Sequence, residues 1–170
     1  IEIILYNIQG RTAVNIETET VAKLARDCKN IVGVKEASGS LGQAQAVRAA
    51  CGEDFIILSG DDNLTLPILA IGGHGVVSVL ANIVPADTKK VIELFNNGDL
   101  AGARDLHYKL LPLAKAMFCD VNPVPVKKAC EILGLCSADV RMPLAAISQE
   151  NENIVKAALD AYGVKKGQLC

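Results

Sequence analysis

The stretch Ile31-Val32-Gly33-Val34-Lys35-Glu36-Ala37-Ser38 decides how this chain folds. Four small or β-branched residues open it, a pattern that predicts a short strand covered on both faces. Lys35 then stands where the strand ends. A lysine in that position most often extends into solvent, but at the mouth of a parallel sheet its amine can instead attack a carbonyl group. The segments on either side decide between these two interpretations.

The same order of strand, loop and helix occurs four times within residues 1–97. We predict strands over residues 2–8, 31–35, 55–59 and 76–79. Helices are predicted over about 15–28, 38–52, 63–71 and 85–96. Buried strands that alternate with amphipathic helices are typical of right-handed βαβ units, so we expect an α/β fold with a parallel sheet.

Polar and unusual residues follow every predicted strand. They are Tyr6, Asn7 and Arg11 in the first unit, Lys35 and Glu36 in the second, Ser59, Asp61 and Asp62 in the third, and Ser78 and Asn82 in the fourth. The carboxyl ends of parallel strands are where (β/α)8 barrels and doubly wound sheets place their sites. We therefore expect the functional site at this edge of the sheet.

The remaining residues, 98–170, form a helical region. Helices are predicted from residue 98 to at least 113, over 126–133 and over 148–162, with a rigid break at residues 122–125. We see no linker between this region and residues 1–97.

Composition narrows the class of protein. The 170 residues are 51% hydrophobic, only 4% aromatic and carry a net charge of −2, which does not suggest a nucleic-acid or membrane-surface partner. No apolar run approaches the roughly 20 residues of a membrane helix. The chain has no signal-peptide pattern and opens inside a predicted strand, as if cut from a longer protein.

The cysteines indicate a reduced, cytoplasmic protein without a metal site, and no cofactor is expected. They are Cys28, Cys51, Cys119, Cys130, Cys136 and Cys170. No Cys-x-x-Cys pair or Cys/His cluster is present, and most lie in apolar helical contexts, where free cysteine behaves as a small hydrophobic residue.

Several residues have two interpretations each. Tyr6 is either a core tyrosine or a general acid/base beside the amine, and Arg11 is either a solvated loop residue or a clamp for a substrate carboxylate. His74 lies in the turn Gly72-Gly73-His74-Gly75 and is expected to be structural. Asp62 is expected to cap the helix that follows it, and His107 to lie at a surface or interface.

Five motifs carry a resemblance to a known family. They are Tyr6-Asn7-Ile8-Gln9-Gly10-Arg11-Thr12, Gly33-Val34-Lys35-Glu36-Ala37-Ser38, Leu58-Ser59-Gly60-Asp61-Asp62, Gly72-Gly73-His74-Gly75-Val76-Val77-Ser78-Val79 and Asn122-Pro123-Val124-Pro125-Val126-Lys127. In this order the chain resembles the dihydrodipicolinate synthase family of pyruvate-dependent class I aldolases, a superfamily that also includes N-acetylneuraminate lyase.

The resemblance implies a site and a reaction. Lys35 would form a Schiff base with pyruvate, and Tyr6 would relay protons. Arg11 would hold a carboxylate at the entrance, while the backbone around Val77 and Gly60 would line the pocket. The second substrate would be aspartate semialdehyde, in lysine and diaminopimelate biosynthesis. Gln9 departs from the family, which usually has proline there.

The resemblance also implies a fold: the last four βα units of a TIM (β/α)8 barrel, followed by a C-terminal helical extension. A whole barrel needs roughly 250 residues. The first four strands, the loop that holds the pyruvate carboxylate and a second tyrosine from a neighbouring subunit have no counterpart here. The open edges and apolar inner face of a half barrel predict a homo-oligomer. Two other functions stay open: a related aldolase for a 2-keto-3-deoxy sugar acid or N-acetylneuraminate, and a non-catalytic half-barrel assembly module.

Overall fold

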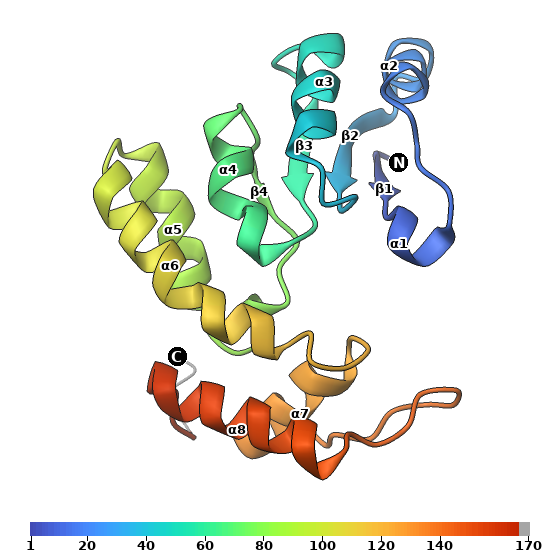
Figure 1. Cartoon of the computed structure of the whole chain (residues 1–170). Coiled ribbons are helices and arrows are strands. Elements are labelled where there is room, and N and C mark those ends of the chain that lie inside the picture. Colours follow the sequence, from blue (N-terminus) through green and yellow to red (C-terminus); the bar gives the residue numbers. More distant parts are fainter. Residues whose placement is uncertain (167–170) are drawn as a thin grey trace. The chain divides into compact units, whose positions relative to one another are not determined.

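The computed structural model describes residues 1–166 and divides the chain into two compact units (Figure 1). The first unit is residues 1–78, and the second begins at Val79. Each unit has its own hydrophobic core, so each is described by itself. The sequence predicts a different division, after residue 97, at the end of the four strand–helix repeats. That division stays a prediction.

The first unit is built on a four-stranded parallel sheet, as predicted. Its strands are β1 (Ile3–Asn7), β2 (Ile31–Glu36), β3 (Ile56–Ser59) and β4 (Gly75–Val76), and they lie in the order β1-β2-β3-β4. The connecting helices are α1 (Gln9–Thr12), α2 (Thr18–Asp27), α3 (Leu41–Cys51), the 3-10 turn η1 (Asp62–Leu64) and α4 (Thr65–Ala70). Strands that follow one another in both sequence and space are the arrangement of a barrel, whereas a doubly wound sheet reverses its order.

Within the first unit, helices cover one face of this sheet and leave the other open. Val34 and Ile57 point to the covered face, where they pack with Val21 of α2, Val47 of α3 and Ile68 of α4. All five side chains are at most 1% exposed. Because alternate residues of a strand point to opposite faces, the residues on either side of Val34 and Ile57 belong to the open face.

The second unit is helical. It consists of η2 (Leu80–Asn82), α5 (Pro85–Asn96), α6 (Leu100–Ala116), α7 (Val124–Ile132) and α8 (Gln149–Tyr162). Ile83, Leu113, Met117 and Leu159 lie in its core and are at most 2% exposed. No helix in residues 1–166 is both long enough and apolar enough to cross a membrane.

Several elements differ from their predicted bounds, and three of the differences affect the kind or length of the element. Residues 9–12, predicted as a loop, form one helical turn that Ala13 ends in the left-handed conformation. β4 is two residues long rather than four. α7 begins at Val124, inside the predicted break, because proline is tolerated in the first turn of a helix and Pro125 occupies that position. Cys170 lies outside the described residues.

Candidate active site

Lys35 and Tyr6 meet on the open face of the sheet. They are cross-strand partners in the β1–β2 register. The Lys35 Nζ atom lies 3.8 Å from the centroid of the Tyr6 ring, a cation–π distance. Tyr6 is 48% exposed and Lys35 is half-buried, so the amine stands over an aromatic face that solvent or a small molecule can reach. In the first unit by itself, Tyr6 is thus exposed and does not belong to the hydrophobic core.

Two glycines make room around the end of β2. A Cβ atom on Gly33 would lie 2.5 Å from the Ile56 carbonyl oxygen, on the same face as Lys35. A Cβ atom on Gly60 would lie 2.3 Å from the Cβ of Ala37. The Gly60 amide donates to the Glu36 carbonyl at 2.7 Å, which ties the end of β3 to the residue after Lys35.

The other two predicted residues lie on separate segments of the same unit. Arg11 is exposed in the last turn of α1, directly beyond the carboxyl end of β1, and forms no ion pair within residues 1–166. Val77 follows β4, is 45% exposed, and donates its amide to the Ser59 carbonyl at 2.8 Å. Arg11, Gly60 and Val77 therefore follow the carboxyl ends of their strands, whereas Tyr6 and Lys35 are the next-to-last residues of theirs.

Asp61 is an acid near the amine that sequence reasoning did not single out for a role. Burial raises the pKa of the Asp61 carboxyl and the nearby Asp62 and Glu36 charges add to that rise, whereas the positive charge of Lys35 lowers it. Asp62 itself was expected to cap the next helix, and this was wrong. Asp62 is the first residue of η1 and its carboxylate accepts a hydrogen bond from the Ser78 hydroxyl.

A polar network on the covered face is the main feature that sequence reasoning missed. Asn7 and Glu36 are cross-strand partners, 1% and 3% exposed, and Asn7 Nδ2 lies 3.2 Å from both Glu36 carboxylate oxygens. Gln43 and Asn15 extend the network to α3 and to the segment before α2. The signal was present, because residues next to Tyr6 and Lys35 in their strands must share the opposite face.

The histidines are structural in the described chain. His74 Nδ1 accepts the Ile57 amide at 3.2 Å, and its own amide donates to the Ile57 carbonyl at 2.8 Å, so the structural role predicted for His74 is confirmed. His107 was expected at a surface or interface, but it lies in α6 and is only 7% exposed. Within residues 1–166, no group of three or more His, Cys, Asp or Glu side chains is arranged to hold a metal ion.

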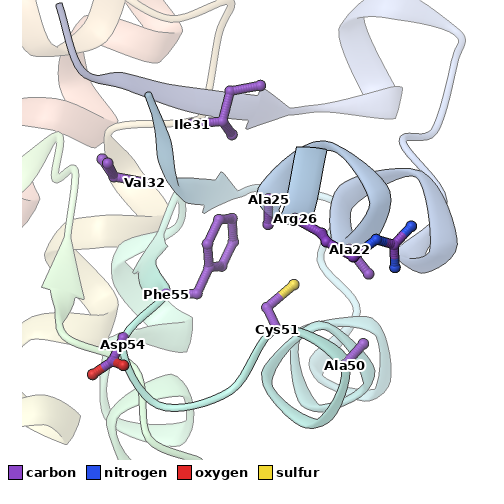
Figure 2. Close-up of a pocket in the computed structure, with 9 residues that line it drawn as sticks. All are labelled: Ala22, Ala25, Arg26, Ile31, Val32, Ala50, Cys51, Asp54 and Phe55. Carbon is purple, nitrogen blue, oxygen red and sulfur yellow. The ribbon is translucent and has the colours of Figure 1, made fainter. Parts of the chain in front are cut away.

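A pocket of about 440 Å³ lies at the opposite end of the strands, between α2 and α3 (Figure 2). Ile31 at the start of β2, Phe55 before β3, Arg26 and Cys51 line it. Burial raises the pKa of the Cys51 thiol, which disfavours the reactive thiolate. Since Lys35 stands at the other end of β2, this pocket is separate from the residues gathered at the carboxyl ends.

A parallel sheet in sequential order, with a lysine and a tyrosine facing each other at its carboxyl edge, defines the class of α/β proteins related to (β/α)8 barrels. The model of the dihydrodipicolinate synthetase family matches residues 1–162. The 4-hydroxy-tetrahydrodipicolinate synthase of Endomicrobium trichonymphae is 52% identical over 166 residues, which are 98% of this chain and 57% of that protein. The chain belongs to the dihydrodipicolinate synthetase family.

Solved structures agree with this assignment. The dihydrodipicolinate synthase of Aquifex aeolicus is 43% identical, with a TM-score of 0.95 over 99% of this chain and 57% of that one. The enzyme of Thermotoga maritima is 36% identical, with a TM-score of 0.94 over 96% of this chain and 57% of that one. The chain thus spans about half the length of the relatives it matches.

Proposed function

We propose that this chain belongs to a lyase that condenses pyruvate with aspartate semialdehyde through a Schiff base on Lys35. The observation that carries the proposal is the Lys35 amine, 3.8 Å above the Tyr6 ring at the carboxyl edge of the sheet. Family membership supports the chemistry, because the relatives it matches are 4-hydroxy-tetrahydrodipicolinate synthases. The pathway would be lysine and diaminopimelate biosynthesis, in the cytoplasm.

The reaction would proceed in three stages. The neutral Lys35 amine attacks the keto carbon of pyruvate, and loss of water leaves an iminium linkage. Loss of a methyl proton then gives an enamine, whose carbon attacks the aldehyde of aspartate semialdehyde, and the aldehyde oxygen takes up a proton. The amino group of the bound product then attacks the iminium carbon, which breaks the bond to Lys35 and releases the amine. Each stage moves protons, and Tyr6 is the titratable group in contact with the amine. The amine lies over the ring face, so the phenol would act on the bound substrate rather than on the free amine.

Arg11, Gly60 and Val77 would shape the rest of the site. Arg11 is exposed and unpaired by an acid within residues 1–166, so its guanidinium is available to a substrate carboxylate. Gly60 and Val77 would line the pocket through their backbone. Their amides already donate to the Glu36 and Ser59 carbonyls, so a ligand would contact other backbone atoms of these two residues.

The chain would be the last four βα units of a TIM barrel, with residues 98–170 as a helical extension. Sequential strand order and helices on one face support this, as does the share of about half of each relative. The open face carries Ile4, Tyr6 and Leu58, which a complete barrel would enclose. A second copy of the chain would supply that cover in a homo-oligomer, and light scattering that gives a monomer would contradict this.

Two other functions can be separated by substrate tests. A related 2-keto-acid aldolase would form the same Lys35 adduct but would release pyruvate from a 2-keto-3-deoxy sugar acid or from N-acetylneuraminate. A non-catalytic assembly module would form no adduct at all. The similarity to 4-hydroxy-tetrahydrodipicolinate synthases favours the synthase over both.

The test is reductive trapping. The folded chain is incubated with pyruvate and borohydride, and the modified residue is identified by mass spectrometry. We expect one pyruvyl adduct, on Lys35, that is lost in Lys35→Arg. Lys29→Arg is the matched control, because Lys29 is an exposed lysine just ahead of the same strand. A folded wild-type chain without the adduct would overturn Schiff-base chemistry in this chain by itself, and an adduct that persists in Lys35→Arg would overturn the assignment to Lys35.

A further inference from the structure

Two cross-strand pairs lie back to back at the carboxyl end of β1 and β2. Tyr6 and Lys35 form the pair on the open face, while Asn7 and Glu36 form the pair on the covered face. The residues are consecutive in each strand, so one register sets both pairs. A slip of one residue would move Glu36 to the open face and Lys35 among the helices.

Three neutral groups donate hydrogen bonds to the Glu36 carboxylate. Asn7 Nδ2 lies 3.2 Å from each oxygen, Gln43 Nε2 donates to Oε2 at 3.2 Å, and the Ser38 amide donates to Oε1 at 2.8 Å. Glu36 takes part in no ion pair within residues 1–166. Both carboxylate oxygens of Glu36 therefore accept hydrogen bonds, whereas a glutamine side chain has only one oxygen that can accept.

The same network closes the base of the segment that carries Arg11. Asn7 Nδ2 also donates to Asn15 Oδ1 at 2.9 Å, and the Ile16 amide donates to Asn7 Oδ1 at 3.0 Å. These bonds join the two ends of the connection between β1 and α2, and Arg11 lies within it. Through Asn7, Glu36 is therefore connected both to the strand pair that carries Tyr6 and Lys35 and to the base of the Arg11 segment.

We propose that Glu36 is the positioning residue of this site: its buried carboxylate fixes the β1–β2 register that holds Lys35 against Tyr6 and anchors the base of the Arg11 segment. Glu36 acts through its neighbours and does not touch substrate, so it is not a catalytic residue. Its importance for the reaction rests on the proposed role of Lys35, but the geometry that it maintains exists without substrate.

The test measures the position of Lys35 directly. In protein labelled with ¹³C-lysine, the side-chain protons of Lys35 should be shifted upfield by the ring current of Tyr6. The Lys35 cross-peak is assigned by its loss in Lys35→Arg, and Tyr6→Leu gives its position without the ring. We expect Glu36→Gln to lose most of the upfield displacement, because its amide nitrogen would face a donor among Asn7, Gln43 and Ser38.

Glu17→Gln is the matched control. Glu17 is exposed and accepts from Asn15 Nδ2 at 2.9 Å, a bond that a glutamine oxygen can still accept. We expect this variant to keep the wild-type Lys35 shift. A folded Glu36→Gln chain whose Lys35 cross-peak stays at the wild-type position would overturn the proposal.

Circular dichroism establishes whether each variant is folded. If Glu36→Gln does not fold, Gln43→Ala replaces it, since that change removes one donor from the carboxylate and leaves the charge in place. We expect a smaller displacement of the Lys35 cross-peak in the same direction, and an unchanged cross-peak would overturn the proposal. None of these spectra needs pyruvate, so failure of the trapping experiment and failure of the positioning role are separate results.

Discussion

Gly60→Ala should weaken both the fold of the first unit and the placement of Lys35. The added Cβ would lie 2.3 Å from the Ala37 Cβ, 3.0 Å from the Ala37 Cα and 3.1 Å from the Glu36 carbonyl oxygen. Carbon atoms in ordinary contact are about 3.5–4.0 Å apart, so these segments must separate by about 1.2 Å or more. The same separation would stretch the hydrogen bond of 2.7 Å that the Gly60 amide donates to the Glu36 carbonyl.

The size of the effect follows from the overlap. Overpacking of this kind costs about 1–3 kcal/mol of unfolding free energy. This corresponds to roughly a 5- to 150-fold change in the folding equilibrium constant. Under the proposed function, a displacement of about 1 Å at the Lys35 amine, which adjoins Glu36, should also slow pyruvate trapping by up to about 100-fold.

The assay is urea unfolding followed by circular dichroism, run as a double-mutant cycle with Ala37→Gly. Removing the Ala37 methyl removes the nearest contact, so the double variant should recover part of the loss, with a coupling energy of about 0.5–3 kcal/mol. Gly10→Ala is the control, because a Cβ there meets nothing within 4 Å. A Gly60→Ala chain as stable as Gly10→Ala, or a cycle without coupling, would refute the steric argument.

Three further predictions concern other parts of the chain. Tyr162 donates to Asp87 Oδ2 at 2.6 Å, and burial together with this acceptor raises the pKa of the Tyr162 phenol above its ordinary value. The contribution of this raised pKa to stability is full below about pH 10 and is lost as pH rises further, because the phenol of the unfolded chain ionises first. In wild type the urea concentration at the unfolding midpoint should therefore fall at alkaline pH, and Tyr162→Phe should remove part of that fall. Cys136 is exposed, whereas burial raises the pKa of the Cys51 thiol. An aromatic disulfide reagent should therefore modify Cys136 about 10-fold faster than Cys51, as measured by peptide mapping. Asp99 caps α6 through its side chain, and Asp99→Ala should cost about 1 kcal/mol in urea unfolding, while an unchanged midpoint would mean that the cap contributes nothing.

The sequence predicted the elements well where a period and a stop signal agreed. The β-branched run ending at Lys35 predicted β2 to within one residue. Ser148 is the N-cap of α8 and Gly163 is its C-cap, as the residue types predict. It failed where one residue type supports two structures. Aspartate is a residue type that often caps helices, yet the Asp62 carboxylate accepts a hydrogen bond from Ser78, sixteen residues away. Only the fold brings these two residues together.

The partners of Glu36 show the same limit. That Asn7 and Glu36 share a face follows from strand alternation, once Tyr6 and Lys35 are placed on the other face. That Gln43 completes the carboxylate site does not follow, because the rotation of α3 on the sheet decides which of its polar residues points inward. Helix orientation depends on the packing of Ala44 and Val47 into the core, which is a property of the assembled unit.

Because side chains alternate along β1 and β2, the candidate catalytic residues and the buried polar residues lie on opposite faces of the sheet. Tyr6 and Lys35 lie on the face that the described chain leaves open, where truncation removes little buried area and breaks only a cation–π contact worth about 0.5–1 kcal/mol at an exposed site. Asn7 and Glu36 lie one residue further along each strand and are buried, where loss of one partner leaves charged or polar groups without hydrogen bonds. Substitutions of Tyr6 and Lys35 should therefore cost less unfolding free energy than substitutions of Asn7 and Glu36, as expected if the covered face holds the open face in register.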